Sequence, residues 1–375
     1  AGAALTLEPL GEGAADMVYD DLTEAVGQVV ERVSTPWTRD DARTLAALSA
    51  AGLVFVAALL LATTPPDALT ALDSYSVTRY NVIAGAIGIV AALLVTATSA
   101  VMTRKYPQAS GIALAHTVPF LTAASALRLS QSHWDTAGWG WTGLGLLIGS
   151  LAVLALPKRY RISIAAPLVV GTVLAATGLL VRLGQLSQAG ISAILFALVI
   201  VLLQVAPWIA LAHIPVRILD ADTTEQIPAK GITDQVSTSF VFVVALRAGG
   251  AIAALFLAVA LMTAPETRSI SLPLTLIVLG AVSLVLQTRS IRARVEVLLG
   301  ALTGLIVILV ATVLGAYADP RTMPWLTLSA IATALVLVIT NVVGPRARPH
   351  LTRLADTISV LSLFVLLPLA VYLWS

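Results

Sequence analysis

The 375-residue chain contains no cysteine, which excludes disulfide bonds, thiolate metal sites and cysteine nucleophiles. Charged residues are also scarce, at 11% of the sequence, whereas a soluble domain carries about 25%. The sequence lacks a phosphate-binding glycine loop, a GxSxG elbow and an HExxH helix, so nothing indicates ATP or peptide hydrolysis. We therefore expect a protein that is not an enzyme and that holds no cofactor or metal.

Long apolar stretches fill almost everything after Arg43, and hydrophobic residues make up 58% of the chain. A helix needs about 20 apolar residues to cross about 30 Å of hydrocarbon. The stretches are continuous and do not alternate, which favours helices over a barrel. The sequence thus predicts an all-α, polytopic membrane protein with about eleven crossings. They cover residues 44–64, 80–102, 108–127, 139–156, 162–181, 189–213, 239–263, 270–287, 296–317, 324–343 and 355–374.

Lysine and arginine are divided unequally between the two sets of loops. One set holds sixteen, the other holds five, and Arg247 is left unassigned near a helix end. The positive-inside rule places the larger set in the cytoplasm. The N-terminus is then predicted to be cytoplasmic, and an odd number of crossings places the C-terminus in the periplasm. The set of five comprises Arg79, Arg128, Arg182, Arg268 and Arg321.

Residues 1–43 are expected to form an acidic cytoplasmic linker, with nine Asp or Glu against three Arg. Within it, residues 14–34 read as an amphipathic helix. Helices that lie on a lipid surface are rich in Lys and Arg, so the acidity favours docking to a protein over a lipid-surface or spacer helix. The chain begins at Ala1 without Met or a signal pattern, and we expect a segment upstream. The proposed docking face comprises Val18, Leu22, Val26, Val29 and Val33.

The only sizeable internal loop covers about 214–236 and is cytoplasmic in this topology. A loop of this length between tightly connected helices often has a function. Two interpretations remain open: a docking site for a cytoplasmic partner and a mobile connector. The candidate docking residues are Asp220, Asp222, Glu225 and Lys230.

The centres of the predicted helices are almost without charge. An ion-driven transporter is expected to keep carboxylates, Lys or His near the midplane. Here the polar candidates are His116, Gln204 and Asn341, while Arg247 and Asp356 fall near cytoplasmic ends. We interpret His116 as an interhelical hydrogen-bond partner rather than a proton relay. A secondary transporter is therefore the alternative function, and the membrane half of an ABC system is a third.

The predicted helices contain small residues four positions apart, a spacing that places them on one helix face. Gly145 with Gly149, and Gly300 with Gly304, are GxxxG pairs. Such pairs let helix backbones approach closely in lipid. They predict helix-packing surfaces.

One combination of features resembles a known family. An acidic amphipathic lead-in precedes Trp-Thr-Arg-Asp-Asp-Ala-Arg at residues 37–43, and eleven helices follow with a long loop between the sixth and seventh. The whole chain resembles EccD, the multi-spanning membrane subunit of mycobacterial type VII (ESX) secretion systems. Among the paralogues, the resemblance leans toward the one tied to iron and zinc acquisition.

The resemblance implies a ubiquitin-like domain ahead of the first helix and an inner-membrane assembly with EccB, EccC and EccE, in which EccC is the ATPase. It also implies that two copies form a barrel-like dimer around a lipid-filled cavity. We therefore expect a non-enzymatic scaffold or conduit subunit that contacts membrane lipids, a second copy of itself and these partners. No nucleic acid is expected to bind.

Overall fold

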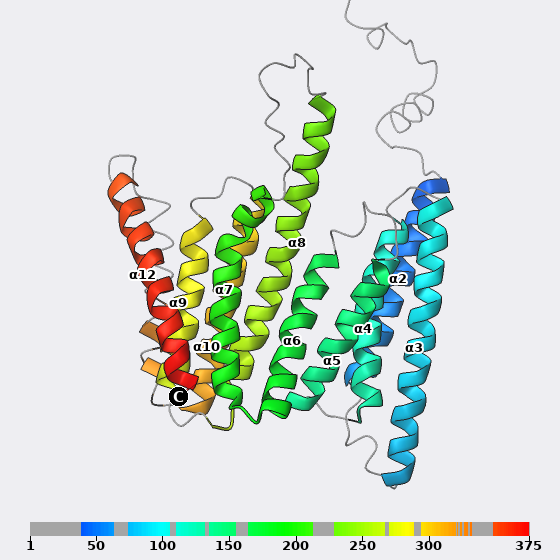
Figure 1. Ribbon diagram of the computed structural model, residues 1–375, viewed down its shortest axis with the longest axis horizontal. Helices are drawn as coiled ribbons and strands as arrows, with labels where there is room; N and C mark the ends of the chain where they lie inside the picture. The colour runs from blue at the N-terminus through cyan, green and yellow to red at the C-terminus, as the bar shows by residue number, and fades with distance from the viewer. Residues whose placement is uncertain are drawn as a thin grey trace, which may run out of the picture. The chain divides into compact units, whose positions relative to one another are not determined.

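The computed structural model describes residues 39–63, 74–105, 110–131, 135–154, 164–212, 229–266, 270–288, 294–319, parts of 321–331, and 348–374. Within these residues every regular element is helical, which confirms the predicted fold class for this part of the chain (Figure 1). The helices are α2 (Arg39–Thr63), α3 (Ser74–Lys105), α4 (Ser110–Leu129), α5 (Thr136–Val153), α6 (Ala165–Gly184), α7 (Gln188–Ala212), α8 (Ala229–Met262), α9 (Ser271–Gln287), α10 (Arg294–Ala318) and α12 (Arg348–Trp374).

Eight of the described helices are long and apolar enough to cross a membrane: α2, α3, α4, α6, α7, α8, α10 and α12. The apolar helix α9 has 17 residues and is shorter than these. The predicted crossing at 139–156 coincides with the 18-residue helix α5, which is not among these eight. Most of 324–343 lies outside the described residues. The count of eleven crossings, and the sides of the two termini, therefore stay predictions.

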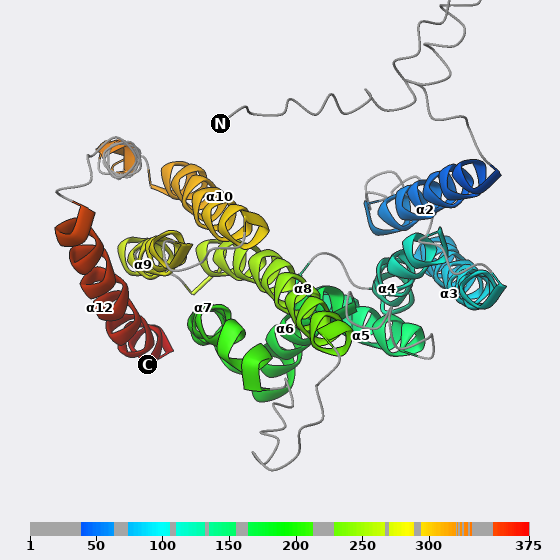
Figure 2. The same cartoon turned by 90° about the horizontal axis from the view of Figure 1, so that it is seen from above.

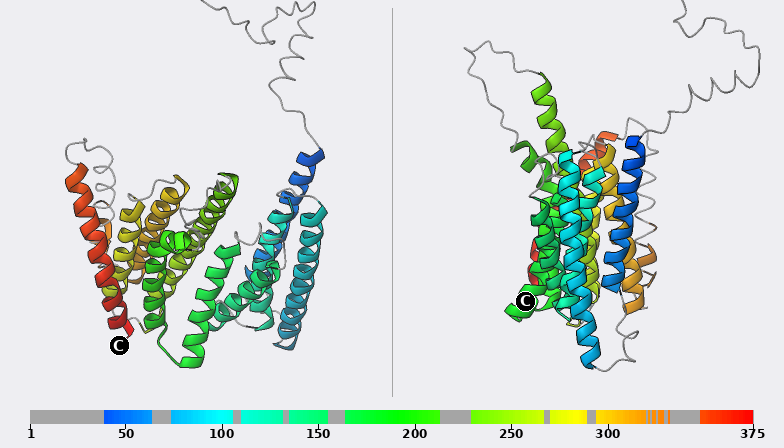
Figure 3. Two further views of the ribbon diagram at one scale, coloured as in Figure 1. Left: turned by 45° about the horizontal axis from the view of Figure 1, so that its top comes forward. Right: turned by 90° about the vertical axis from the view of Figure 1, so that its right-hand side faces the viewer.

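The chain divides into two compact units, Ala1–Ala46 and Ala47–Ser375. Of the first, the structure describes residues 39–46, the first two turns of α2. In the second, α3, α4, α5 and α6 pack each against the next, and α7, α8, α9, α10 and α12 form a further group. From α2 to α10, successive helices run in opposite directions (Figure 3).

Helix α8 joins the two groups of the second unit. It packs against α6, α7 and α10, which lie around it in Figure 2. The largest buried cluster among the described residues lies mainly within the group of α7, α8, α9, α10 and α12. It includes Phe196, Ile200, Leu257, Leu276 and Ile277, none of them more than marginally exposed. This cluster fixes the relative positions of α7, α8 and α9.

Large apolar side chains also cover the outside of the bundle. Leu53, Leu183 and Phe364 are each more than 70% exposed. Lipid tails are as apolar as leucine, so such exposure carries no cost in a bilayer. The outward surface is therefore suited to contact with lipid.

Helix α8 has 34 residues, and its membrane-crossing stretch begins only at Ser239. At 1.5 Å per residue, the ten residues before Ser239 add about 15 Å of helix. Figure 1 shows these first turns extending beyond the ends of α6 and α7. The predicted loop at 214–236 is therefore wrong from residue 229 onward, because that part of the chain is helical.

Candidate functional site

A buried ion pair links α8 to α10 inside the second unit. The Nη1 of Arg247 lies 3.1 Å from the Oε2 of Glu296, and the two side chains are 5% and 10% exposed. A charge at this depth is costly unless it is paired. The sequence placed Arg247 near a cytoplasmic helix end and gave no partner for it. In the structure its side chain is buried against Glu296.

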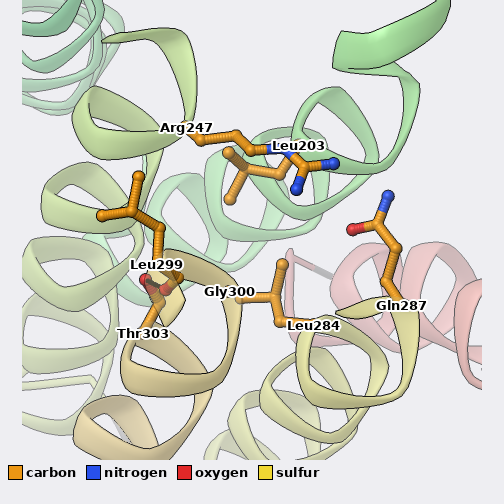
Figure 4. Close-up of a pocket in the computed structure, with 7 residues that line it drawn as sticks. All are labelled: Leu203, Arg247, Leu284, Gln287, Leu299, Gly300 and Thr303. Carbon is orange, nitrogen blue, oxygen red and sulfur yellow. Dashed lines mark hydrogen bonds between the residues drawn. The ribbon is translucent and has the colours of Figure 1, made fainter. Parts of the chain in front are cut away.

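A small cavity lies beside this pair (Figure 4). Its volume is about 20 Å³, and its lining includes Arg247, Gln287 and Thr303. In the view of Figure 4, the guanidinium of Arg247 and the amide of Gln287 point toward each other. Among the described residues, Nε and Nη2 of Arg247 have no hydrogen-bond partner. A space of this size fits one water molecule and is too small for an organic substrate.

Polar side chains next to the cavity connect α7 to α9. The Nε2 of Gln204 donates to the hydroxyl of Ser283 at 2.7 Å. The Nε2 of Gln287 donates to the carbonyl oxygen of Gln204 at 3.1 Å. Hydrogen bonds of this kind hold membrane helices together. The polar side chain of Gln204, a midplane candidate from the sequence, is thus occupied in helix packing.

His116 bonds within its own helix. Its Nδ1 lies 2.7 Å from the carbonyl oxygen of Ile112, one turn earlier in α4. The bond that the structure shows is therefore not the interhelical one that we expected. The third polar candidate, Asn341, lies outside the described residues.

Both predicted glycine pairs lie against a neighbouring helix. A Cβ at Gly145 would lie 2.5 Å from the Thr122 carbonyl oxygen, and one at Gly149 would lie 2.6 Å from Cα of Pro119, both in α4. The Thr122 hydroxyl donates to the Gly145 carbonyl oxygen at 2.7 Å, so backbone approach and hydrogen bond occur together. Gly300 and Gly304 of α10 face α9 in the same way, with the side chains of Thr288 and Val285 within 2.8 Å of the added Cβ atoms.

A close backbone approach between α5 and α6 was missed from the sequence. A Cβ at Gly143 would lie 2.2 Å from the Ala175 nitrogen, and a Cβ at Gly178 would lie 2.2 Å from the Gly140 nitrogen. Gly140 and Gly143 are three residues apart, so a search for GxxxG does not find them. Gly171 and Gly178, spaced by seven on one face of α6, were the available signal.

Among the described residues, no three His, Cys, Asp or Glu side chains gather closely enough to hold a metal ion. The polar groups of the described helices are used mainly in contacts between or within helices. What this arrangement can do is hold helices together in lipid.

A family model described as the EccD-like transmembrane domain matches residues 42–375. The chain belongs to this EccD-like family. It is a multi-pass protein of the bacterial inner membrane and a type VII secretion membrane subunit. The match begins at Ala42, where the apolar stretch of α2 also begins.

Two solved structures share this EccD-like fold. A chain in the structure of protomer 1 of the ESX-3 core complex is 18% identical, with a TM-score of 0.67, and the match covers 96% of this chain and 81% of that one. A chain of the MycP5-free ESX-5 inner membrane complex, State II, is 15% identical, with a TM-score of 0.66 and coverage of 88% and 77%. No curated protein matches the sequence. At these identities the likeness establishes the fold, and the lean toward one paralogue stays a prediction.

The two predicted docking segments of the EccD-like chain fall mostly outside the described residues. The whole 14–34 segment lies outside them, as do Asp220, Asp222 and Glu225. Lys230 lies in the first turn of α8, and its side chain is not described. Docking by these residues remains a prediction.

Proposed function

We propose that this EccD-like chain is a non-catalytic structural subunit of a type VII secretion complex. In this proposal, two copies form a transmembrane scaffold around a lipid-filled cavity, and the cytoplasmic segments dock the ATPase EccC. EccB and EccE are the other proposed partners. The titles of the two similar structures name an ESX-3 core complex and an ESX-5 inner membrane complex, which supports a place in such an assembly.

The observation that carries the proposal is that three polar side chains of the described helices are used in contacts between helices. Arg247 pairs with Glu296, Gln204 bonds to Ser283, and Thr122 bonds to the backbone of Gly145. Each of these contacts joins two helices. Polar residues used in this way stabilise a scaffold, whereas a transporter needs them turned toward a substrate path.

Exposed helix faces support the association of two copies. In α2 and in α12, only 17% of the apolar membrane-crossing window is buried within the chain, compared with 61% in α7. These helices thus offer wide apolar faces to lipid or to another protein. A second copy packed against α2 or α12 would bury part of that surface.

The extension of α8 supports cytoplasmic docking. Its first ten residues continue the helix beyond the membrane-crossing stretch and begin directly after residues 213–228. A rigid helix there would hold the acidic residues of the loop at a distance from the lipid surface. An ATPase could reach a loop presented in this way.

The test reverses the loop charges in the full chain. Changing Asp220, Asp222 and Glu225 to Lys should reduce recovery of the ATPase with the chain in mild detergent, while membrane insertion is unaffected. Reversal of Asp67 and Asp73, in a loop predicted on the opposite side, is the matched control and should leave recovery at the wild-type level. Unchanged ATPase recovery with the loop variant would refute docking through this loop.

A further inference from the structure

A second, larger pocket lies within the Ala47–Ser375 unit, between α2, α4, α5, α6 and α8. Its volume is about 270 Å³. The rings of Phe55 and Phe120 meet edge to face there, with centroids 5.4 Å apart, and Phe256 adds a third aromatic ring. Trp139 packs edge-on against Phe256 at 4.9 Å and holds it in place. The walls are almost entirely apolar.

One polar side chain in this lining lacks a hydrogen-bond partner among the described residues. Thr142 of α5 lines the pocket and is 6% exposed, and its buried hydroxyl oxygen has no hydrogen-bond partner among the residues that the structure describes. Most threonines in the described helices bond to a carbonyl one turn back, as Thr172 does to Leu168 at 2.8 Å. Threonine carries a hydroxyl and a methyl group on Cβ, so rotation about χ1 can turn the hydroxyl toward whatever fills the pocket.

The depth of Thr142 indicates the kind of group that it would meet. It lies six residues into α5, about 9 Å along the helix, and directly follows Trp141, which is 45% exposed. Exposed tryptophans mark the level of lipid headgroups. Thr63, the last residue of α2, also lines the pocket, whereas Phe55 lies about 12 Å further along that helix. The pocket therefore leads from the membrane surface, past Thr142, toward the hydrocarbon.

We propose that this pocket binds one acyl chain of a glycerophospholipid, and that the Thr142 hydroxyl donates a hydrogen bond to the ester carbonyl of that chain. The apolar walls suit the hydrocarbon, and the hydroxyl lies at the depth where an ester group follows the headgroup. The site is complete within one chain. It needs neither a second copy nor the ATPase, so its failure would leave the proposed function untouched.

The experiment compares two photoactivatable phosphatidylglycerols, each with a diazirine in one acyl chain. One is a diester, and the other is a diether that lacks the carbonyl oxygens. The full chain, with the subunits that accompany it in mild detergent, is irradiated at subsaturating lipid, and crosslinked residues are mapped by mass spectrometry. The diester should label pocket residues such as Phe55, Phe120 and Leu146 about 2- to 10-fold more than the diether, the range of one hydrogen bond.

Two variants localise the effect. Thr142→Val keeps the side-chain shape and should bring the diester-to-diether ratio near one, whereas Thr172→Val should keep the wild-type ratio. Ala62→Trp, at the mouth of the pocket, should reduce labelling of the pocket by both lipids while leaving that of the exposed Leu183 unchanged. Equal labelling by the two lipids in wild type, a ratio that survives Thr142→Val, or no label in the pocket would each overturn the proposal.

Discussion

The ion pair between Arg247 and Glu296 holds helix α8 against helix α10. Each is a charge held away from water, on two helices that the chain connects only through α9. Removing one partner would leave the other charge buried and alone, which is far more costly than removing both. The pair therefore stabilises α8 against α10 as a unit.

Glu296→Leu should lower the free energy of unfolding by about 3–5 kcal/mol, because it leaves Arg247 unpaired. The double variant Arg247→Met with Glu296→Leu should recover most of this loss. Thermal unfolding in detergent measures both. As a control, Arg182→Met at an exposed helix end should change stability little. If Glu296→Leu were as stable as wild type, the pair would not hold the helices together.

A second prediction for a single residue concerns Gly143, where the backbones of α5 and α6 approach closely. Gly143→Ala places a methyl group 2.2 Å from the Ala175 nitrogen, so α5 and α6 must separate, and we expect a cost of about 1–3 kcal/mol. Gly52→Ala is the matched control, since no atom lies within 4 Å of the added Cβ, and should be neutral or slightly stabilising. Melting temperatures in one detergent give the comparison. Equal behaviour of the two variants would contradict the packing role of Gly143.

At the scale of the element, the helices are held together by a few polar bonds and many small residues. Gln204, Ser283 and Gln287 connect α7 to α9, while glycines bring α4, α5 and α6 together. In lipid, where the hydrophobic effect does not drive helices together, association rests on close packing and on such interhelical hydrogen bonds.

Replacing Gln204 with Leu, or His116 with Phe, distinguishes a scaffold from a transporter. Loss of the Gln204–Ser283 bond should cost about 0.6–2 kcal/mol of stability, and secretion should stay near the wild-type level with either variant. A secretion assay on cells that carry each variant measures the scaffold prediction. Solute uptake by the reconstituted wild-type chain that is lost in either variant would instead favour the secondary transporter.

The sequence predicted the elements better than their contacts. Hydrophobic runs place the membrane-crossing stretches of α2, α3 and α8 to within a few residues, because lipid demands a continuous apolar stretch. The partner of Arg247 could not be predicted, since no spacing in the sequence relates residues on α8 and α10. An apolar pocket, or an unpartnered hydroxyl such as that of Thr142, depends on the positions of several helices at once. No sequence pattern therefore predicts either of them.

At the scale of the whole molecule, the unequal distribution of basic residues predicts the topology. Because the chain has no cysteine, each introduced cysteine is the only thiol. Cysteines placed beside Arg159, Arg292 and Arg348 should be labelled only from the cytoplasm, and Ser375→Cys only from the periplasm. Labelling of intact and permeabilised cells with an impermeant maleimide tests this. Periplasmic labelling beside those arginines would contradict the topology.

The most direct test of the central claim is the composition of the particle that contains this chain. Extraction of native membranes in mild detergent, followed by mass measurement and subunit identification, should give a large complex with two copies of the chain, an ATPase and further membrane subunits. A chain that is recovered alone and is active in solute uptake after reconstitution would contradict the claim.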